Sequence, residues 1–485
     1  MDSLSYGSKA IDMLNTKKSV LVGGIILVAA LASIAAGFIA VKQLAIMLLM
    51  LFIAAMLLWM GTWAEKNILL FLMVANALFL YKFDSLERLS LLILPVVFAV
   101  VVVSKRTLTP QKRRNLKLLA PYFLFFLIVA YWYSTSGLLP TLIFGGRGGE
   151  GNFKLYYANF LNLLALLLPF FLKINRRDFK RAFTVAMWIY IVELIVVIVG
   201  YQLDIIHALG RMEAVRISML ARISFYVGFL VLFFGKDTFW DWTHLIVCSC
   251  LLLNLFWGGG RMEFGMLLFA YMWYCFTSRD SRSRVFAAAT RRKAILAYAT
   301  VLIIIWMAWT YYLPSAQAER FDELLNPFQS KDLGTVEIET GGRLAQWHYA
   351  VVDSPPLAFG RGFTKYFDIS DYDTLVARQV ETGAAHNLYA SIFYTFGYVG
   401  LASFLLHLFI LARKLWSFYK VVPYDQTAMF ICGFLMIWYL VYSFFAASIS
   451  GYFFLPYFLT GYILSLDNKS VPVLSRRMGY LHRRL

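Results

Sequence analysis

Long apolar runs recur through nearly the whole chain and are separated by short polar stretches. A helix that crosses a bilayer needs roughly 20 consecutive, mostly apolar residues. The pattern therefore predicts about fourteen membrane spans, with approximate ends at 20–41, 43–63, 67–82, 89–104, 118–135, 155–172, 182–201, 217–235, 239–257, 262–277, 294–313, 387–412, 427–447 and 451–466. We expect an all-α polytopic membrane protein.

Composition supports this prediction. The 485 residues are 61% hydrophobic and 15% charged, whereas soluble domains are nearer half apolar and a quarter charged. An ordinary soluble core cannot bury this much apolar surface. We therefore expect one membrane bundle rather than several soluble domains.

The basic residues are concentrated in a few short loops, at 105–117, 173–181, 279–293 and 413–420, and in the tail at 467–485. Alternating the predicted spans places all of these segments on one face. Because Lys and Arg are enriched in cytoplasmic loops, this face is predicted to be cytoplasmic, together with both termini. The net charge of +18 is then a consequence of topology, and we do not expect nucleic-acid binding.

One long polar segment, 314–386, interrupts the apolar pattern and is predicted to lie outside. It contains eleven acidic and six basic residues, a net charge of −5. A loop of this length is usually functional or disordered. Its aromatic residues and a helix-like stretch at 341–352 favour an ordered loop that packs partly over the bundle. The expected organisation is eleven spans in 1–313, the loop, three spans in 387–466, and a basic cytoplasmic tail at 467–485.

Metal and disulfide chemistry are not indicated. Cys248, Cys250, Cys275 and Cys432 all lie within apolar runs, so we interpret them as small buried residues. Asp371 and Asp373 could form a metal-binding pair, but a solvated turn is the simpler interpretation. We expect no metal and no cofactor.

Arginines on the outer side are unexpected under the positive-inside rule, so they are candidate functional residues. These positions are Arg147, Arg211, Arg216, Arg222, Arg261 and Arg343. Arg222 lies just inside a predicted span, Arg261 follows three glycines at a span end, and Arg211 and Arg216 are placed in a loop. Guanidinium groups bind phosphate oxygens through paired hydrogen bonds, which favours a lipid-linked diphosphate as the ligand. The alternative is structural: ion pairs with Glu150, Glu213 or Glu263.

Histidine supplies a second candidate. His386 immediately precedes Asn387, where the long loop re-enters the membrane. A neutral imidazole at that boundary could accept the proton of a sugar hydroxyl, although a lone histidine is more often structural. His348 also lies in the loop, five residues after Arg343, so the two point to different helix faces.

These elements together resemble a known family. Its long-loop pattern is matched by Gly342-Arg343 with Trp347, Pro355-Pro356, Phe359-Gly360 with Gly362, His386-Asn387 with Tyr389, and Gly397 with Gly400. Gly260-Arg261 matches its small-residue–arginine element. Over about 216–400 the chain resembles the O-antigen ligase and polymerase superfamily of bacterial envelope polysaccharide enzymes.

The resemblance implies a GT-C-like helical bundle and a metal-independent, inverting transfer of a glycan from undecaprenyl diphosphate to a sugar hydroxyl. Carried over by position, His386 would be the general base, and Arg261 and Arg343 would bind the diphosphate. Arg216 and Arg222 would assist. Secondary candidates are Arg147, Arg211, His348 and Asn387.

We therefore expect a bacterial inner-membrane O-antigen polymerase that joins lipid-linked repeat units in the periplasm. The number of spans favours the polymerase over the alternative, a ligase that transfers the chain to lipid A-core. A flippase of lipid-linked glycans is a third possibility, but the sequence shows no repeated halves, which many transporters have. Expected partners are an undecaprenyl-diphosphate-linked oligosaccharide, membrane lipids and, as a further candidate, a chain-length regulator.

Overall fold

The computed structural model describes the parts of the chain at 63–78, 94–102, 108–134, 149–202, 213–235, 242–254, 261–277, 358–360, 387–419, 425–443 and 453–466. Within these parts the chain is helical and contains no strand. Three helices are long and apolar enough to cross a membrane, at Pro110–Tyr133, Arg176–Val199 and Leu388–Tyr419. The prediction of an all-α membrane protein is confirmed.

The count of fourteen spans stays a prediction. The spans expected at 20–41, 43–63 (apart from Trp63) and 294–313 lie outside the described residues. The same holds for the tail at 467–485 and for the long loop at 314–386, apart from the short piece 358–360.

The helices follow the predicted apolar runs. Their bounds are α3 Glu65–Leu78, α5 Pro110–Leu116, η1 Lys117–Leu119, α6 Ala120–Tyr133, α8 Gly149–Phe171, α9 Arg176–Gln202, α10 Glu213–Phe234, α12 Thr243–Leu252, α13 Arg261–Thr277, α20 Leu388–Tyr419, α21 Gln426–Met436, η8 Ile437–Tyr442 and α23 Phe454–Ser465. The element η8 is a π-helix that directly continues α21. Residues 94–102 are also helical.

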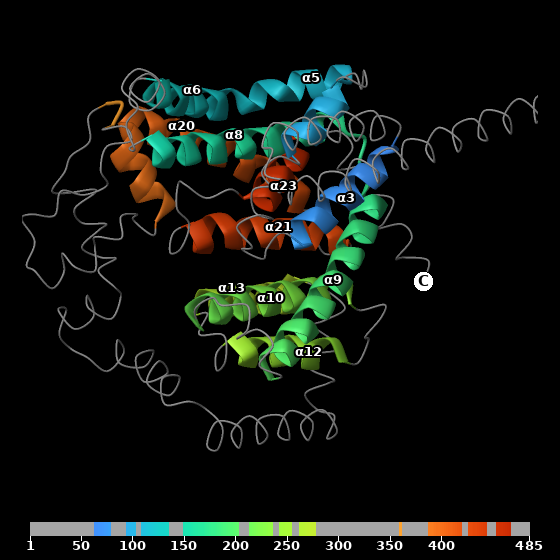
Figure 1. Ribbon diagram of the computed structural model, residues 1–485. Helices are drawn as coiled ribbons and strands as arrows, with labels where there is room; N and C mark the ends of the chain where they lie inside the picture. Colours follow the sequence, from blue (N-terminus) through green and yellow to red (C-terminus); the bar gives the residue numbers. More distant parts are fainter. Residues whose placement is uncertain are drawn as a thin grey trace, which may run out of the picture.

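Most of the helices run side by side, as Figure 1 shows, with α6 and α12 on opposite edges of the bundle and α21 near its middle. The closest packing partners are α8 with α23, α6 with α20, and α10 with α9, α12 and α13. Helix α9 crosses the others obliquely and packs against α3 (Figure 1).

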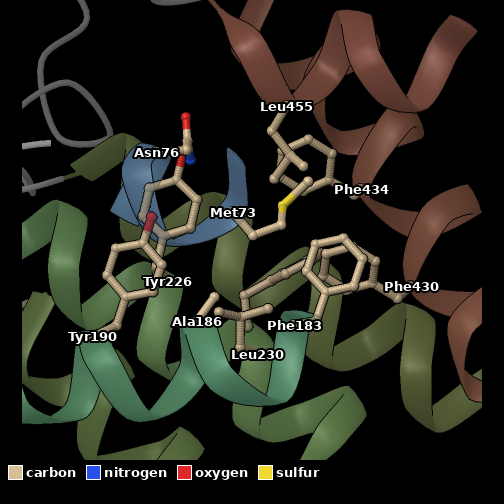
Figure 2. Close-up of a pocket in the computed structure, with 11 residues that line it drawn as sticks. Met73, Asn76, Phe183, Ala186, Tyr190, Tyr226, Leu230, Phe430, Phe434 and Leu455 are labelled. Atoms are coloured by element: carbon tan, nitrogen blue, oxygen red, sulfur yellow. The ribbon is translucent and has the colours of Figure 1, made fainter. Parts of the chain in front are cut away.

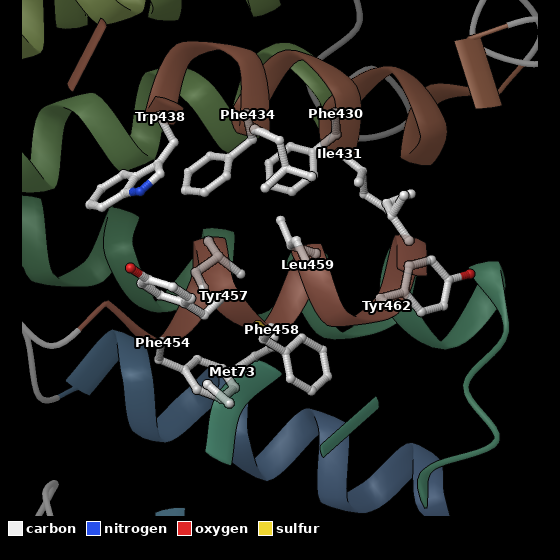
Figure 3. Packing of buried hydrophobic residues seen from close by; sticks show 14 of the residues in the cluster. Met73, Phe430, Ile431, Phe434, Trp438, Phe454, Tyr457, Phe458, Leu459 and Tyr462 are labelled. Atoms are coloured by element: carbon white, nitrogen blue, oxygen red, sulfur yellow. The ribbon is translucent and has the colours of Figure 1, made fainter. Parts of the chain in front are cut away.

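Helix α23 is the central element, since all of its residues are buried. Figure 3 shows Tyr457 and Leu459 of this helix facing Phe434 and Trp438, with Met73 of α3 on the other side. Small residues allow close backbone approach. A Cβ atom on Gly461 would lie 2.0 Å from the carbonyl oxygen of Leu166 in α8. Such small-residue contacts are common between membrane helices.

The outer surface of the bundle is apolar. Exposed large hydrophobic side chains lie along α9 and α20, including Val192, Ile195, Val196, Leu405, Leu406 and Phe409. Exposing this apolar surface to water would be unfavourable, whereas contact with the apolar tails of lipids would not. These exposed faces support the membrane assignment independently of the length of each helix.

Polar contacts gather the basic segments at one end of the bundle. Lys112 of α5 donates hydrogen bonds from Nζ to the carbonyl oxygens of Pro169 (2.8 Å) and Leu172 at the end of α8. At the start of α9, Arg176 forms an ion pair with Asp425, the residue that caps α21. These contacts place the starts of α5, α9 and α21 beside the end of α8.

The ends of α20 and α23 lie at the same place. Lys414 of α20 donates to the carbonyl oxygen of Leu466, 3.2 Å away. The side-chain amide of Asn115 donates to the same oxygen at 2.8 Å. The described parts of three predicted cytoplasmic segments, 105–117, 173–181 and 413–420, therefore meet at one end, which we call the basic end.

One predicted boundary was wrong: Arg216 does not lie in a loop, because α10 already begins at Glu213. The span predicted at 387–412 falls within α20, one of the three helices that are long and apolar enough to cross a membrane. The hydropathy pattern did not predict the break of α20 at Gly397, whose φ is 69°. Hydropathy reports burial in lipid, and it carries no information about a local change in backbone conformation.

Candidate functional site

A cavity of about 170 Å³ lies at the end of the bundle opposite the basic end. It is lined by Asn76, Arg222, Phe225, Tyr226, Glu263, Met266, Phe434, Ile437, Trp438, Tyr442, Phe453, Phe454, Leu455 and Pro456. Its position follows from helix direction. Helix α21 starts at the basic end and continues into η8, and α23 finishes at the basic end, so η8 and the start of α23 lie at the other end.

Arg222 and Glu263 supply the charge of this cavity. The Nε atom of Arg222 lies 3.9 Å from Oε1 of Glu263, which is beyond hydrogen-bond distance. The Glu263 side chain is 16% exposed and that of Arg222 is 42% exposed. The structural alternative for Arg222, an ion pair with Glu263, is therefore present, but in a loose form that uses one edge of the guanidinium group.

The opposite wall of the cavity is aromatic. The rings of Trp438 and Tyr442, both in η8, stack with centroids 4.4 Å apart, and Phe453 meets Trp438 edge-on at 4.6 Å. The indole N–H of Trp438 is buried and has no hydrogen-bond acceptor among the residues that the structure describes. Because π-helical turns frequently occur at functional sites, η8 is a further reason to consider this wall.

A smaller apolar hollow lies next to the cavity. The two share four lining residues: Asn76, Tyr226, Phe434 and Leu455. Figure 2 shows Tyr190 beside Tyr226 and Met73 between the surrounding helices; the two tyrosine rings are stacked at 5.0 Å. With about 10 Å³ of space, this hollow has room for no more than one water molecule. The side chains thus close the cavity on this side.

The helices that carry Arg222 and Glu263 also contain two other arginines of the predicted site. Arg261 is the first residue of α13, two residues before Glu263. Arg216 lies in α10, six residues before Arg222. A helix rises 1.5 Å per residue, so these backbone positions lie about 3 Å and 9 Å further along their helices. Their side chains are outside what the structure describes.

Asn387 has a structural task in this fold. Its Oδ1 accepts hydrogen bonds from the backbone N–H groups of Tyr389 (2.9 Å) and Ala390 (3.0 Å). This arrangement caps the start of α20. Tyr389 then donates from its hydroxyl to the carbonyl oxygen of Tyr439 at 2.6 Å. The start of α20 is thereby joined to η8, the element that carries Trp438.

The short piece 358–360 of the long loop is docked onto the same end. The indole Nε1 of Trp132 in α6 donates to the carbonyl oxygen of Phe359 at 2.8 Å. The backbone N–H of Val399 donates to the carbonyl oxygen of Ala358 at 3.0 Å. The loop is therefore fixed to α6 and α20 at this point.

Glycine makes this docking possible. Gly360 has a φ of 78°, and a Cβ atom there would lie 2.3 Å from the carbonyl oxygen of Thr395. The residue rests directly on the break in α20 at Gly397. Only glycine adopts such a φ without a steric cost and also permits so close a contact. The break and the docked loop form one local structure.

The remaining predicted site residues are Arg147, Arg211, Arg343, His348 and His386, and all lie outside the described residues. The convergence of His386 with Arg261 and Arg343 therefore stays a prediction. Within the described parts of the chain, no group of three or more His, Cys, Asp or Glu residues could hold a metal ion.

Sequence reasoning missed the aromatic wall. Trp438 and Tyr442 are four residues apart within an apolar run, as in any buried helix face. For Glu263 the sequence predicts only the task of a counter-ion. No signal in the sequence distinguishes these residues from ordinary bundle packing.

The apolar outer surface, the basic end and the charged cavity opposite it define a multi-pass membrane protein with a polar site near one membrane face. Comparison with known families is more specific. Residues 246–405 match the family model described as O-antigen ligase. No curated protein matches the chain. The match confirms the resemblance to the O-antigen ligase and polymerase superfamily over this segment.

The matched segment contains Arg261, Arg343 and His386, together with the docked piece 358–360 and the break in α20. It begins after Arg216 and Arg222, so the family match does not extend to these two arginines. Arg222 nevertheless lies in the same cavity as Glu263, which belongs to the matched segment.

Proposed function

We propose that this protein is an O-antigen or surface-polysaccharide polymerase with a GT-C-like fold. It transfers a glycan from undecaprenyl diphosphate to a sugar hydroxyl of another lipid-linked repeat unit, on the periplasmic side of the inner membrane. The observation that carries this proposal is the match to the O-antigen ligase family over 246–405, the segment with five of the predicted site residues.

The orientation is supported by the charge distribution. Lys112, Arg176 and Lys414 mark the basic end, which the positive-inside rule assigns to the cytoplasm. The cavity with Arg222 lies at the opposite end. Lipid-linked glycans presented at the outer leaflet would meet this end of the bundle.

The proposed reaction is a single displacement without a metal. His386 accepts the proton of the acceptor hydroxyl, whose oxygen forms a bond to the anomeric carbon of the donor. The bond between that carbon and the diphosphate oxygen breaks, so undecaprenyl diphosphate leaves and the configuration inverts. Arg261, Arg343, Arg216 and Arg222 bind the diphosphate and offset the charge that develops on it.

A ligase is the second candidate, because the matching family is described as O-antigen ligase. It would use the same donor and the same leaving group. The acceptor would be a hydroxyl of lipid A-core instead of a second lipid-linked repeat unit.

Purified protein in nanodiscs, supplied with synthetic lipid-linked repeat units and lipid A-core, tests both candidates. Longer lipid-linked glycans indicate a polymerase, and glycan on lipid A-core indicates a ligase. The variant His386→Ala should form neither product. A matched control is His244→Ala, since His244 contacts the hydroxyl of Tyr271 within the bundle. Absence of both products with correctly folded protein would contradict the proposal.

A further inference from the structure

The chemistry of the cavity lining is mixed. Arg222 is a cation, Glu263 and Asn76 carry hydrogen-bond acceptors, and the wall of Trp438 and Tyr442 is aromatic. Burying the charged pair under a hydrocarbon tail would remove its water without any replacement partner. A diphosphate that filled the whole cavity would be repelled by Glu263, which lies beside Arg222. The best-matched ligand combines an anion with neutral hydroxyl groups and an apolar face.

From this match we infer that the cavity is the subsite for the sugar ring attached directly to the diphosphate of the donor lipid. The inference rests on the proposed function and names the part of the substrate that this site recognises. The ring would lie against Trp438 and Tyr442, and its hydroxyl groups would donate to Glu263 and Asn76. The phosphate would lie on the Arg222 side.

The size of the cavity is compatible with this assignment. A cavity of about 150 Å³ accommodates a six-membered ring such as benzene, and the cavity here measures about 170 Å³.

The loose ion pair explains how Arg222 and Glu263 act on one ligand. Glu263 approaches the Nε edge of the guanidinium group, whereas phosphate is bound through pairs of N–H donors. The Nη atoms can therefore bind phosphate while the carboxylate accepts from a sugar hydroxyl. Glu263 is then a specificity-determining residue as well as a counter-ion.

The test compares binding of two lipids to the full-length protein in nanodiscs: undecaprenyl diphosphate alone, and the same lipid carrying one hexose. We expect the wild type to bind the hexose-bearing lipid about tenfold more tightly. Trp438→Leu should abolish this preference and leave the affinity for the bare lipid within about twofold. Trp416→Leu, at a side chain that is 75% exposed on α20, is the matched control and should keep the preference.

A second variant guards against a folding defect in Trp438→Leu. Glu263→Gln keeps the size of the side chain and removes its charge, so it should weaken the hexose preference and strengthen binding of the bare lipid. Equal binding of both lipids by the wild type would overturn the inference while leaving the proposed function intact. An equal loss of affinity for both lipids in Trp438→Leu, with unchanged thermal stability, would also overturn the inference. Binding of neither lipid by the wild type would overturn the proposed function together with the inference.

Discussion

The cationic side chains at the two ends of the bundle have different kinds of partner. At the basic end, Lys112 and Lys414 donate to backbone carbonyl oxygens and Arg176 pairs closely with Asp425. At the cavity end, Arg222 has a counter-ion at 3.9 Å that meets only one edge of its guanidinium group. Cations at the basic end hold helices together, whereas the ion pair at the cavity end is loose. This contrast supports the binding task that we propose for Arg222.

The largest effect is expected at the residue that precedes the α20 cap. His386→Ala should lower the rate of glycan transfer by about 10²- to 10⁴-fold, because general-base catalysis accelerates a reaction by a factor of that size. Assays of lipid-linked product length at equal amounts of membrane-inserted protein measure this. Transfer at the wild-type rate would remove His386 from the reaction and restrict the cavity end to binding.

Arg222→Lys tests whether charge alone is sufficient in the cavity. The ammonium keeps the charge but cannot form the paired contacts of a guanidinium. We expect transfer to fall about 100-fold, the usual cost of losing one preorganised donor to developing charge. Thermal unfolding should change little, because the ion pair with Glu263 is loose. A large loss of stability with normal activity per folded molecule would instead give Arg222 a structural task.

Gly360→Ala should perturb the docked piece of the loop. The added Cβ would meet the carbonyl oxygen of Thr395, and the φ of 78° is unfavourable for alanine. We expect destabilisation by about 1–3 kcal/mol, together with a lower transfer rate, since the start of α20 depends on the same break. Gly265→Ala is the control, because a Cβ there meets no atom within 4 Å. Equal behaviour of the two variants would show that the docking is dispensable.

The smallest effect on transfer is expected at the basic end. Arg176→Gln breaks the ion pair with Asp425 and should lower the free energy of unfolding by about 1–3 kcal/mol, since it leaves a half-buried carboxylate with a weaker partner. Activity per folded molecule should stay near the wild-type value. A hundredfold loss of transfer at unchanged stability would remove the contrast between the two ends.

Several parts of the fold could be predicted from the sequence. Helices α9 and α13 follow apolar runs, and the described parts of three basic segments meet at one end as the charge pattern indicates. The placement of Arg216 in a loop was wrong, because a helix can begin in polar residues before the apolar run starts. The break at Gly397 was not predicted, although Gly397 was part of the family pattern. Hydropathy is averaged over many residues and contains no information about the backbone conformation of any one of them.

The candidate site was predictable in part. Arg222 was selected because a charge beside lipid is costly, and it does line a cavity. Its aromatic wall could not be selected, because Trp438 and Tyr442 have the spacing of ordinary core residues. Only the packing of η8 against α13, together with the packing of α21 against α10, makes them face the same space as Arg222.

The sequence by itself determined that this protein spans a membrane and that the basic segments at 105–117, 173–181 and 413–420 share one end. Both properties are sums over single residues: the transfer of apolar side chains into lipid and the placement of Lys and Arg beside it. Only the tertiary structure decided that Arg222, Glu263 and Trp438 line one cavity and that a loop residue rests on the break in α20. Those contacts join segments distant in the chain, and their geometry depends on how whole helices pack.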